Sequence, residues 1–198
     1  MSTAVDTAEW ARLAELVEGP IRTRDRRHRE LDELFREAST PVLERGSYRG
    51  VLSGAFHPLV DALGAGFKRL WMPWVGKHLE PSEERGYNLL KPGADTVLGQ
   101  FLGSSPTYPC GRLTAGYEFG YRLGPSALDD GRQVGRIEYA DVVTNPDFLR
   151  RMHDELVQVV PGVLLGRFVV NRDEPRVTAW FALHGPVMAP RVERVRAV

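Results

Sequence analysis

Cysteine, net charge and long apolar runs are what this 198-residue sequence has least of. Cys110 is the only cysteine, which excludes an internal disulfide and a cysteine-rich zinc cluster. Lysine plus arginine and aspartate plus glutamate number 26 each, so no overall field selects nucleic acid, an acidic membrane or an acidic substrate. The chain opens without a signal-peptide pattern, and no uninterrupted apolar run reaches about 18 residues. These absences predict a cytoplasmic protein that binds neither nucleic acid nor a membrane.

The first forty residues are predicted to form two amphipathic helices. Asp6 and Glu9 have capping-box spacing at the start of the first helix, and apolar residues recur at helical spacing in both. The stripes consist of Trp10, Leu13, Ala14 and Val17 in the first helix and of Leu31, Leu34, Phe35 and Ala38 in the second. We expect residues 1–40 to form a helical segment packed on a domain of residues 41–198.

Beyond a third helical stretch, from His57 to Trp74, the pattern changes to short strands separated by turn signals. A helix capped by Asn145 and closed by Pro161 is expected to interrupt them, with an apolar stripe of Phe148, Met152 and Leu156. The predicted strands cover residues 75–79, 86–91, 95–102, 114–123, 133–143, 163–171 and 176–184.

Short turns between successive strands favour antiparallel pairing, and a closed barrel leaves few strand edges unpaired. The expected fold class is α+β and mainly β. The expected architecture is an antiparallel lipocalin-like β-barrel with N-terminal and flanking helices.

The run Gly46-Ser47-Tyr48-Arg49-Gly50 places a large aromatic residue between two glycines just after the second helix. Glycines let the chain turn and pack closely, which suits the first strand of a small barrel. Tyr48 is then either a residue at the floor of a cavity, with its hydroxyl on a ligand, or a core aromatic that contributes packing alone.

Six segments together resemble bacterial GXWXG-domain proteins and the domain of unknown function that accompanies them. They are Gly46-Ser47-Tyr48-Arg49-Gly50, His57-Pro58-Leu59, Trp74-Val75-Gly76-Lys77, Ile137-Glu138-Tyr139-Ala140-Asp141-Val142-Val143, Gly162-Val163-Leu164-Leu165-Gly166-Arg167 and Trp180-Phe181-Ala182-Leu183. Tyrosine stands where the family's name has tryptophan. The resemblance implies a lipocalin-like barrel, and it implies no particular reaction.

The stretch from Ala115 to Arg122 alternates cleanly, with Tyr117, Phe119 and Tyr121 on one face of a strand. If this face points inward, the two tyrosines line a cavity with hydroxyls that can orient a ligand. If it points outward, Glu118 and Arg122 lie inside and need to be paired. The aromatic-inward arrangement is favoured because it is the usual pattern of a half-buried strand.

Glu138 and Asp141 are the acid–base candidates, because each lies in an otherwise apolar, strand-like run. A carboxylate desolvated by a barrel wall has a raised pKa, which suits proton transfer near neutral pH. The alternative is that Glu138 points to water beside Arg136. The histidines have no recognised metal-ligand spacing, so neither a metal nor a cofactor is expected.

These observations predict a barrel that binds a small hydrophobic or aromatic metabolite, with Tyr121 joining the two carboxylates as a candidate catalytic residue. The expected ligand-binding residues are Tyr48, Trp71, Trp74, Tyr117, Phe119 and Trp180. One reading is a cofactor-independent cyclase or isomerase that works by positioning its substrate. Another is a carrier without catalysis, and a third is an interaction module that uses the N-terminal helices. A homodimer is left open.

Overall fold

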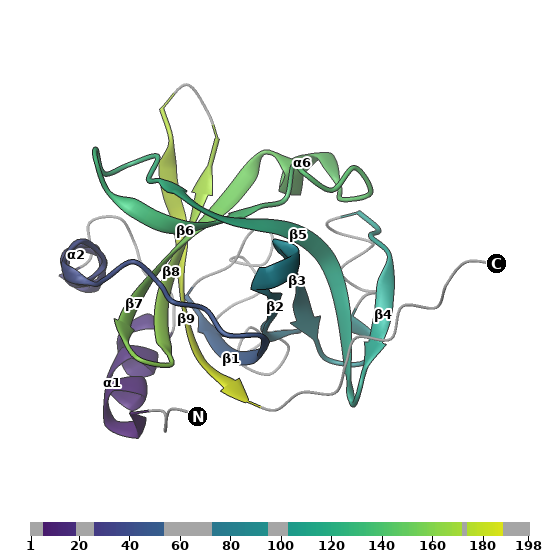
Figure 1. The fold of residues 1–198 in the computed structure, drawn as a ribbon, viewed down its shortest axis with the longest axis horizontal. Helices are drawn as coiled ribbons and strands as arrows, with labels where there is room; N and C mark the ends of the chain where they lie inside the picture. The colour runs from purple at the N-terminus through teal and green to yellow at the C-terminus, as the bar shows by residue number, and fades with distance from the viewer. Residues whose placement is uncertain (1–5, 19–25, 54–72, 95–102, 172–173, 188–198) are drawn as a thin grey trace.

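The computed structural model describes residues 6–18, 26–53, 73–94, 103–171 and 174–187. Eight antiparallel strands form a closed ring in these residues (Figure 1). They are β1 (Gly46–Leu52), β2 (Trp74–Glu80), β3 (Arg85–Leu90), β5 (Leu113–Pro125), β6 (Gln133–Glu138), β7 (Met152–Val160), β8 (Val163–Val170) and β9 (Arg176–Val187). Each strand pairs with its neighbours along the chain, and pairings of β9 with β1 and of β3 with β5 close the ring. The short strand β4 (Thr107–Cys110) pairs only with β5. The predicted mainly-β, lipocalin-like barrel is therefore confirmed.

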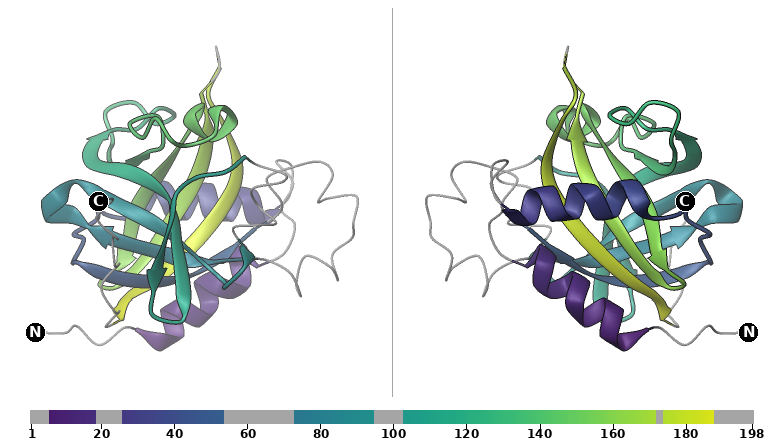
Figure 2. Two further views of the ribbon diagram at one scale, coloured as in Figure 1. Left: turned by 90° about the vertical axis from the view of Figure 1, so that its right-hand side faces the viewer. Right: turned by 90° about the vertical axis from the view of Figure 1, so that its left-hand side faces the viewer.

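Two helices cover one outer face of the barrel (Figure 2). Helix α1 (Thr7–Val17) begins as its spacing predicts, because the Asp6 carboxylate accepts hydrogen bonds from the backbone N–H groups of Ala8 and Glu9. The apolar stripes of α1 and of α2 (Arg26–Glu37) are buried against outward-facing residues of β6 to β9. This outer apolar cluster contains Leu13, Val17, Leu31, Phe35, Val134, Val157, Leu165 and Trp180. The stripes of both helices are therefore used within the chain.

A buried ionic group also joins α2 to the barrel. Arg167, on β8, bonds Glu155 and Asp129, both at 2.6 Å, and Asp129 accepts a further bond of 3.0 Å from Arg36 of α2. Burial raises the pKa of Glu155, but the hydrogen bond from His153 and the charge of Arg167 outweigh burial and lower it to about 2. The ionised carboxylate is therefore part of the folded structure.

Glu155→Gln is expected to lower the free energy of unfolding by about 3 kcal/mol at pH 7, since each unit of pKa shift corresponds to about 1.4 kcal/mol. A carboxylate with a depressed pKa stabilises the fold above its unfolded pKa, near 4.5, and this contribution is lost as the pH falls toward 2. Urea unfolding between pH 7 and pH 2 should therefore show the variant and the wild type converging below about pH 4.5. Glu15→Gln, on the exposed side of α1, is the control. A difference that does not depend on pH contradicts this account.

The interior of the barrel contains a second apolar cluster, the inner cluster. One end of the barrel is closed. The segment between α2 and β1 bonds β7 and β6, through Ser39 to Gln158 and through Thr40 to Gln133, and then enters β1. Leu43, in this segment, packs on the inner cluster. Tyr48 also lies in that cluster, and its hydroxyl bonds the backbone of Glu44 as donor and as acceptor. The Tyr48 side chain and this segment close the end of the barrel.

Four inner residues lie at the other end of the barrel and keep 7 to 9% of their surface exposed. They are Leu52, Ala94, Leu149 and Met152. Helix α6 (Asp147–Arg150) lies at this end, which we call the mouth (Figure 1). Trp74, the first residue of β2, is half-buried at the mouth, where its ring lies 2.4 Å from the position a Cβ of Gly50 would take.

The helix predicted from Asn145 to Pro161 is wrong over most of its length. Only α6 is helical, and residues 152–160 form β7. Met152 and Leu156 share one face in either conformation, since residues four apart lie on the same side of a helix and of a strand. Pairing with both β6 and β8 then decides for the strand, and the valines near its end suit it.

The remaining strand predictions agree with β2, β3, β5, β8 and β9 within a few residues at each end. The strand predicted over 133–143 ends earlier, at Glu138, and a turn follows. Trp74 was expected to end a helix, and it begins β2 instead. The rest of that helix and the strand predicted over 95–102 lie outside the described residues.

Candidate functional site

A lysine lies inside the barrel with its side chain fully buried. Lys77, on β2, is directly opposite Tyr48 of β1 and Asn88 of β3 in the strand register. Its Nζ donates to Asn88 Oδ1 at 2.9 Å and to the Tyr139 hydroxyl at 2.8 Å, and it lies 2.9 Å from Asp154 Oδ2. The ammonium group is thus held by three oxygen atoms from three separate parts of the barrel wall.

Asp154 and Tyr139 complete this group. The Tyr139 hydroxyl donates to Asp154 Oδ2 at 2.9 Å, so the lysine, the tyrosine and the aspartate form a triangle of mutual contacts. Asp154 has no exposed surface, and within the described part of the chain its second oxygen, Oδ1, has no hydrogen-bond partner. A buried carboxylate oxygen without a donor is costly, and its presence needs an explanation.

Asn88 links the triangle to the mouth. Its Oδ1 accepts hydrogen bonds from Lys77 and from the indole Nε1 of Trp74, the latter at 3.0 Å. Its amide nitrogen donates to the backbone carbonyl of Tyr117 at 3.1 Å, which fixes the orientation of the side chain. We call Lys77, Asn88, Tyr139 and Asp154 the inner polar cluster.

Aromatic rings surround the inner polar cluster. The Nζ of Lys77 lies 4.9 Å from the ring centroid of Phe119 and 5.3 Å from that of Phe181, with three further rings between 5.4 and 5.9 Å. The other three belong to Tyr139, Phe168 and Trp74. These rings exclude water, which strengthens every charge interaction inside, and their faces attract a cation.

Burial changes the protonation of the pair. It lowers the pKa of Lys77, opposed by the nearby Asp154 charge, and it raises the pKa of Asp154, opposed by Lys77. Burial and the Asp154 charge also raise the pKa of Tyr139 well above its usual value, so the phenol keeps its proton. Both shifts favour the neutral form of each group, and a proton that passes from Lys77 to Asp154 leaves the total charge of the cluster unchanged.

The aromatic-inward arrangement of β5 is confirmed. Tyr117, Phe119 and Tyr121 all belong to the inner apolar cluster. The Tyr117 hydroxyl donates to the carbonyl of Gly103, and burial raises the pKa of Tyr121 to about 12. Burial also raises the pKa of Tyr48 to about 12, so neither Tyr48 nor Tyr121 ionises near neutral pH. Among the predicted ligand-binding residues, Phe119 and Trp74 have their ring centroids 4.9 and 5.9 Å from the Lys77 Nζ, and Tyr48 lies opposite Lys77 in the register.

Glu138 and Asp141 do not face the interior, so their predicted placement is wrong. Ile137 and Tyr139 lie in the inner cluster, and alternation along β6 therefore turns Glu138 outward. There it bonds Arg136 at 2.7 Å and Arg122 at 3.4 Å, which is the alternative that the sequence left open. Asp141 lies in the turn after β6, with 47% of its side chain exposed, and contacts Arg122.

Trp180 is also misplaced by the sequence prediction. Its side chain belongs to the outer apolar cluster, where its ring lies at 65° to that of Phe35 and its Nε1 donates to His28 at 2.9 Å. It is a core residue between α2 and the barrel. Trp71 lies outside the described residues.

The sequence analysis missed the inner polar cluster, although part of it had a local signal. Lys77 and Leu79 are two residues apart in the strand predicted over 75–79, so their side chains lie on the same face. Because Leu79 is in the inner apolar cluster, Lys77 also points inward. Asp154 was hidden by the helix predicted over its segment. Asn88 and Tyr139 had no signal beyond their polar groups in strand-like runs.

A serine, a histidine and a glutamate meet on the outer side of β1 and β2. His78 lies 3.0 Å from Ser47 Oγ and 3.3 Å from Glu80 Oε1, and burial lowers the histidine pKa. Ser47 and His78 are directly opposite in the register, and Glu80 follows His78 by two residues on the same face. Ordinary cross-strand pairing therefore accounts for this group.

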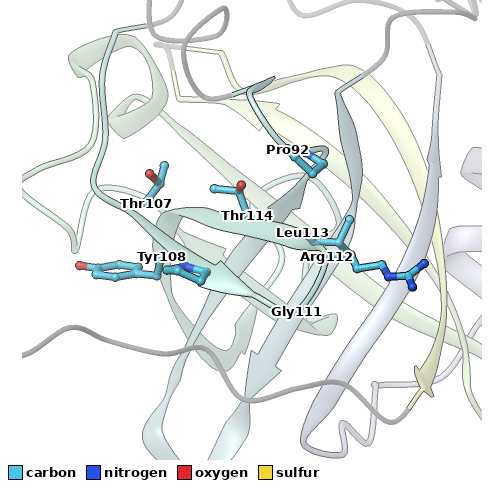
Figure 3. Close-up of a pocket in the computed structure, with 8 residues that line it drawn as sticks. Pro92, Thr107, Tyr108, Gly111, Arg112, Leu113 and Thr114 are labelled. Atoms are coloured by element: carbon cyan, nitrogen blue, oxygen red, sulfur yellow. The ribbon is translucent and has the colours of Figure 1, made fainter.

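An open hollow of about 540 Å³ lies on the outside of the barrel, between the β4–β5 hairpin and the turn after β3 (Figure 3). It is lined by Pro92, Thr107, Tyr108, Pro109, Gly111, Arg112, Leu113 and Thr114. None of these residues belongs to the inner polar cluster. Only Arg112 among them is charged, so this surface offers little chemistry.

Two negative findings concern the described residues alone. No group of three metal-ligating side chains occurs among them. None of their helices is long and apolar enough to cross a membrane.

The fold and the cluster define a closed antiparallel barrel with an ionisable group in its interior. No protein-family model matches the sequence, and no curated protein matches it. The chain is similar to the crystal structure of a protein from Thermomonospora curvata, at 18% sequence identity, with 88% of this chain and 95% of the other covered and a TM-score of 0.49. These comparisons name no function, so the inner polar cluster is the feature from which one has to be inferred.

Proposed function

We propose that the barrel binds a small, mostly apolar or aromatic metabolite that carries a carbonyl oxygen, and that the inner polar cluster moves a proton on it. The reaction class is a cofactor-independent isomerisation or cyclisation. The proposal includes a cytoplasmic location and a relationship to the GXWXG-domain proteins that the sequence resembles. The observation that carries the proposal is the triangle of Lys77, Asp154 and Tyr139 inside an otherwise apolar barrel.

The cost of burying this triangle supports a role beyond stability. An ion pair taken out of water loses more hydration than it regains in attraction, and well-packed apolar residues often replace such a pair without loss. Apolar side chains, including Phe119, Phe168 and Phe181, already fill the rest of the interior, so apolar residues could also occupy the positions of the ion pair. Strongly perturbed titratable groups gathered in one apolar space are typical of functional sites.

The cluster contains the groups that proton transfer needs. Lys77 Nζ and Asp154 Oδ2 lie 2.9 Å apart, so a proton can move between them and one group can act as a base while the other acts as an acid. The Tyr139 hydroxyl keeps its proton and can donate a hydrogen bond to a ligand oxygen as negative charge develops there. The aromatic rings hold an apolar ligand and exclude water.

The proposal is tested with β-tetralone, an apolar ketone with acidic protons beside its carbonyl. In D₂O the wild type is expected to accelerate exchange of these protons, followed by ¹H NMR. A double substitution, Lys77→Met with Asp154→Leu, is expected to abolish the acceleration. Tyr139→Phe is expected to lower it by about 10²-fold, the low end for one acid–base group.

Glu138→Gln is the matched control, because it removes a carboxylate from the outer face of the same barrel wall. It is expected to leave exchange unchanged. Binding of β-tetralone without accelerated exchange would favour a carrier over an enzyme. Exchange that survives in the double variant, or that is lost in the control, would contradict the assignment to the inner polar cluster.

A further inference from the structure

The use of lysine in this chain is selective. Of its 26 basic residues only three are lysines, Lys68, Lys77 and Lys91, and the other 23 are arginines. Arginine remains charged in proteins and cannot act as an amine nucleophile, whereas a buried lysine gives up its proton readily. One of the three lysines, Lys77, has no exposed surface.

We propose that Lys77 is a nucleophile that forms an imine with the carbonyl carbon of the ligand. This inference deepens the proposed function and rests on it, since it requires that an apolar carbonyl compound bind beside the cluster. It names the ligand class as aldehydes or ketones and gives Lys77 a covalent role.

The arrangement around Nζ suits this reaction. Asp154 Oδ2, at 2.9 Å, accepts the proton that Lys77 must lose before its nitrogen has a free electron pair. Asp154 Oδ1 has no partner among the described residues, so the protonated carboxyl group can carry its proton on this oxygen and give it to the ligand oxygen. Besides Asp154, Nζ bonds Asn88 and Tyr139, and Asn88 also accepts a bond from Trp74 at the mouth. The proposal requires a ligand that enters at the mouth to displace Nζ from Asn88 and Tyr139.

The steps balance without an oxidant or a cofactor. The neutral amine of Lys77 attacks the carbonyl carbon, and the C–N bond forms as the electron pair of the C=O double bond moves to oxygen. A proton passes from nitrogen to that oxygen through Asp154. The protonated Asp154 then gives its own proton to the hydroxyl group, which leaves as water while the C=N bond forms. The products are a protonated imine and an ionised Asp154, so the buried ion pair is kept.

An imine at Lys77 would also promote the proton transfer of the proposed function. A protonated imine draws electrons from the neighbouring carbon more strongly than the ketone does, so a proton on that carbon becomes easier to remove. Tyr139 and Asp154 lie within hydrogen-bond distance of Nζ and hence beside the atoms that react. Imine formation is therefore a route by which this cluster promotes isomerisation or cyclisation.

The test uses naphthaldehyde, which is apolar and has no exchangeable proton beside its carbonyl, and naphthylmethanol, its nearly isosteric alcohol. Isothermal calorimetry measures binding of both compounds. Sodium cyanoborohydride then reduces any imine formed by the aldehyde to a stable amine, and peptide mass mapping identifies the modified residue. The proteins are the wild type, Lys68→Arg with Lys91→Arg, and Lys77→Met with Asp154→Leu.

We expect the wild type to be modified at Lys77 despite its burial, and the variant whose sole lysine is Lys77 to be modified equally. The variant without Lys77 should show none at that position. The pH profile is a second readout. Each unit by which the pKa of an amine falls raises its reactive fraction at neutral pH about tenfold, so trapping at Lys77 should persist at lower pH than trapping at the exposed Lys91.

The outcomes separate the two proposals. Binding of both compounds, with trapping only at Lys68, Lys91 or the N-terminal amine, would overturn the imine and leave the proposed function standing. Binding of neither compound would overturn the proposed function itself. Trapping at Lys77 with the same pH profile as Lys91 would show an ordinary exposed amine and would overturn the role assigned to the cluster.

Discussion

Lys77→Met should lower the free energy of unfolding by about 3–5 kcal/mol, and adding Asp154→Leu should restore most of the loss. The single substitution leaves the Asp154 carboxylate buried without its counter-charge, and its Oδ1 already has no partner among the described residues. The double substitution removes both charges and places apolar side chains of similar size among Phe119, Phe168 and Phe181. Urea unfolding of the wild type, both single variants and the double variant measures the coupling between the two residues.

An exposed pair is the control for this cycle. Arg122 and Asp141 lie 3.4 Å apart with about half of each side chain exposed. Exposed pairs of this kind contribute about 0–1 kcal/mol, so the equivalent substitutions should have small and additive effects. If the Lys77 and Asp154 double variant is as unstable as the worse single variant, the cluster contributes to stability through more than its charges, and the argument from burial cost fails.

Gly76→Ala is expected to lower the free energy of unfolding by about 3–5 kcal/mol, from backbone strain and steric overlap together. Gly76 has a φ of +148°, and a Cβ there would lie 1.9 Å from the backbone carbonyl oxygen of Tyr48. The clash is with backbone, which cannot rotate away as a side chain can. Relief requires β1 and β2 to separate at the point where Tyr48 faces Lys77.

Gly93→Ala separates the two causes. Gly93 also has a positive φ, +76°, but nothing lies within 4 Å of the Cβ position. Its substitution carries backbone strain alone and should cost about 1–2 kcal/mol. Thermal or urea unfolding of both variants gives the comparison. Equal losses at the two sites would show that the close contact with Tyr48 has no energetic weight.

The sequence correctly predicted those helices and strands whose own residues show a clear capping or periodic pattern. Asp6 caps the first helix, and the aromatic residues of β5 alternate clearly enough to give the inward face. The segment of Met152 and Leu156 fails because their spacing fits a helix and a strand equally. Only pairing with strands β6 and β8 distinguishes the two, and this pairing is not encoded locally.

The inner polar cluster could not be predicted for a related reason. Its four residues come from β2, β3, the position directly after β6, and β7, and they meet because closure of the barrel sets the register of these strands. Glu138 and Tyr139 show that the side-chain direction depends on a single position in the sequence. They are adjacent in sequence, and a difference of one position places one on the outer face and the other beside Lys77.

The run from Gly46 to Gly50, at the start of β1, contributes to both ends of the barrel. Gly50 accommodates the ring of Trp74, whose indole bonds Asn88, and Tyr48 closes the end of the barrel opposite the mouth. The run thus shapes both ends of the space around the cluster. None of its side chains needs to take part in chemistry.

The most direct test of the central claim is β-tetralone exchange catalysed by the folded double variant, Lys77→Met with Asp154→Leu. Unfolding in urea first establishes that the variant is folded, and exchange at matched protein concentration is then compared with the wild type by ¹H NMR. If the inner polar cluster serves catalysis and not stability, the double variant should be nearly as stable as the wild type and should catalyse no exchange. A stable variant that exchanges β-tetralone as fast as the wild type would contradict it.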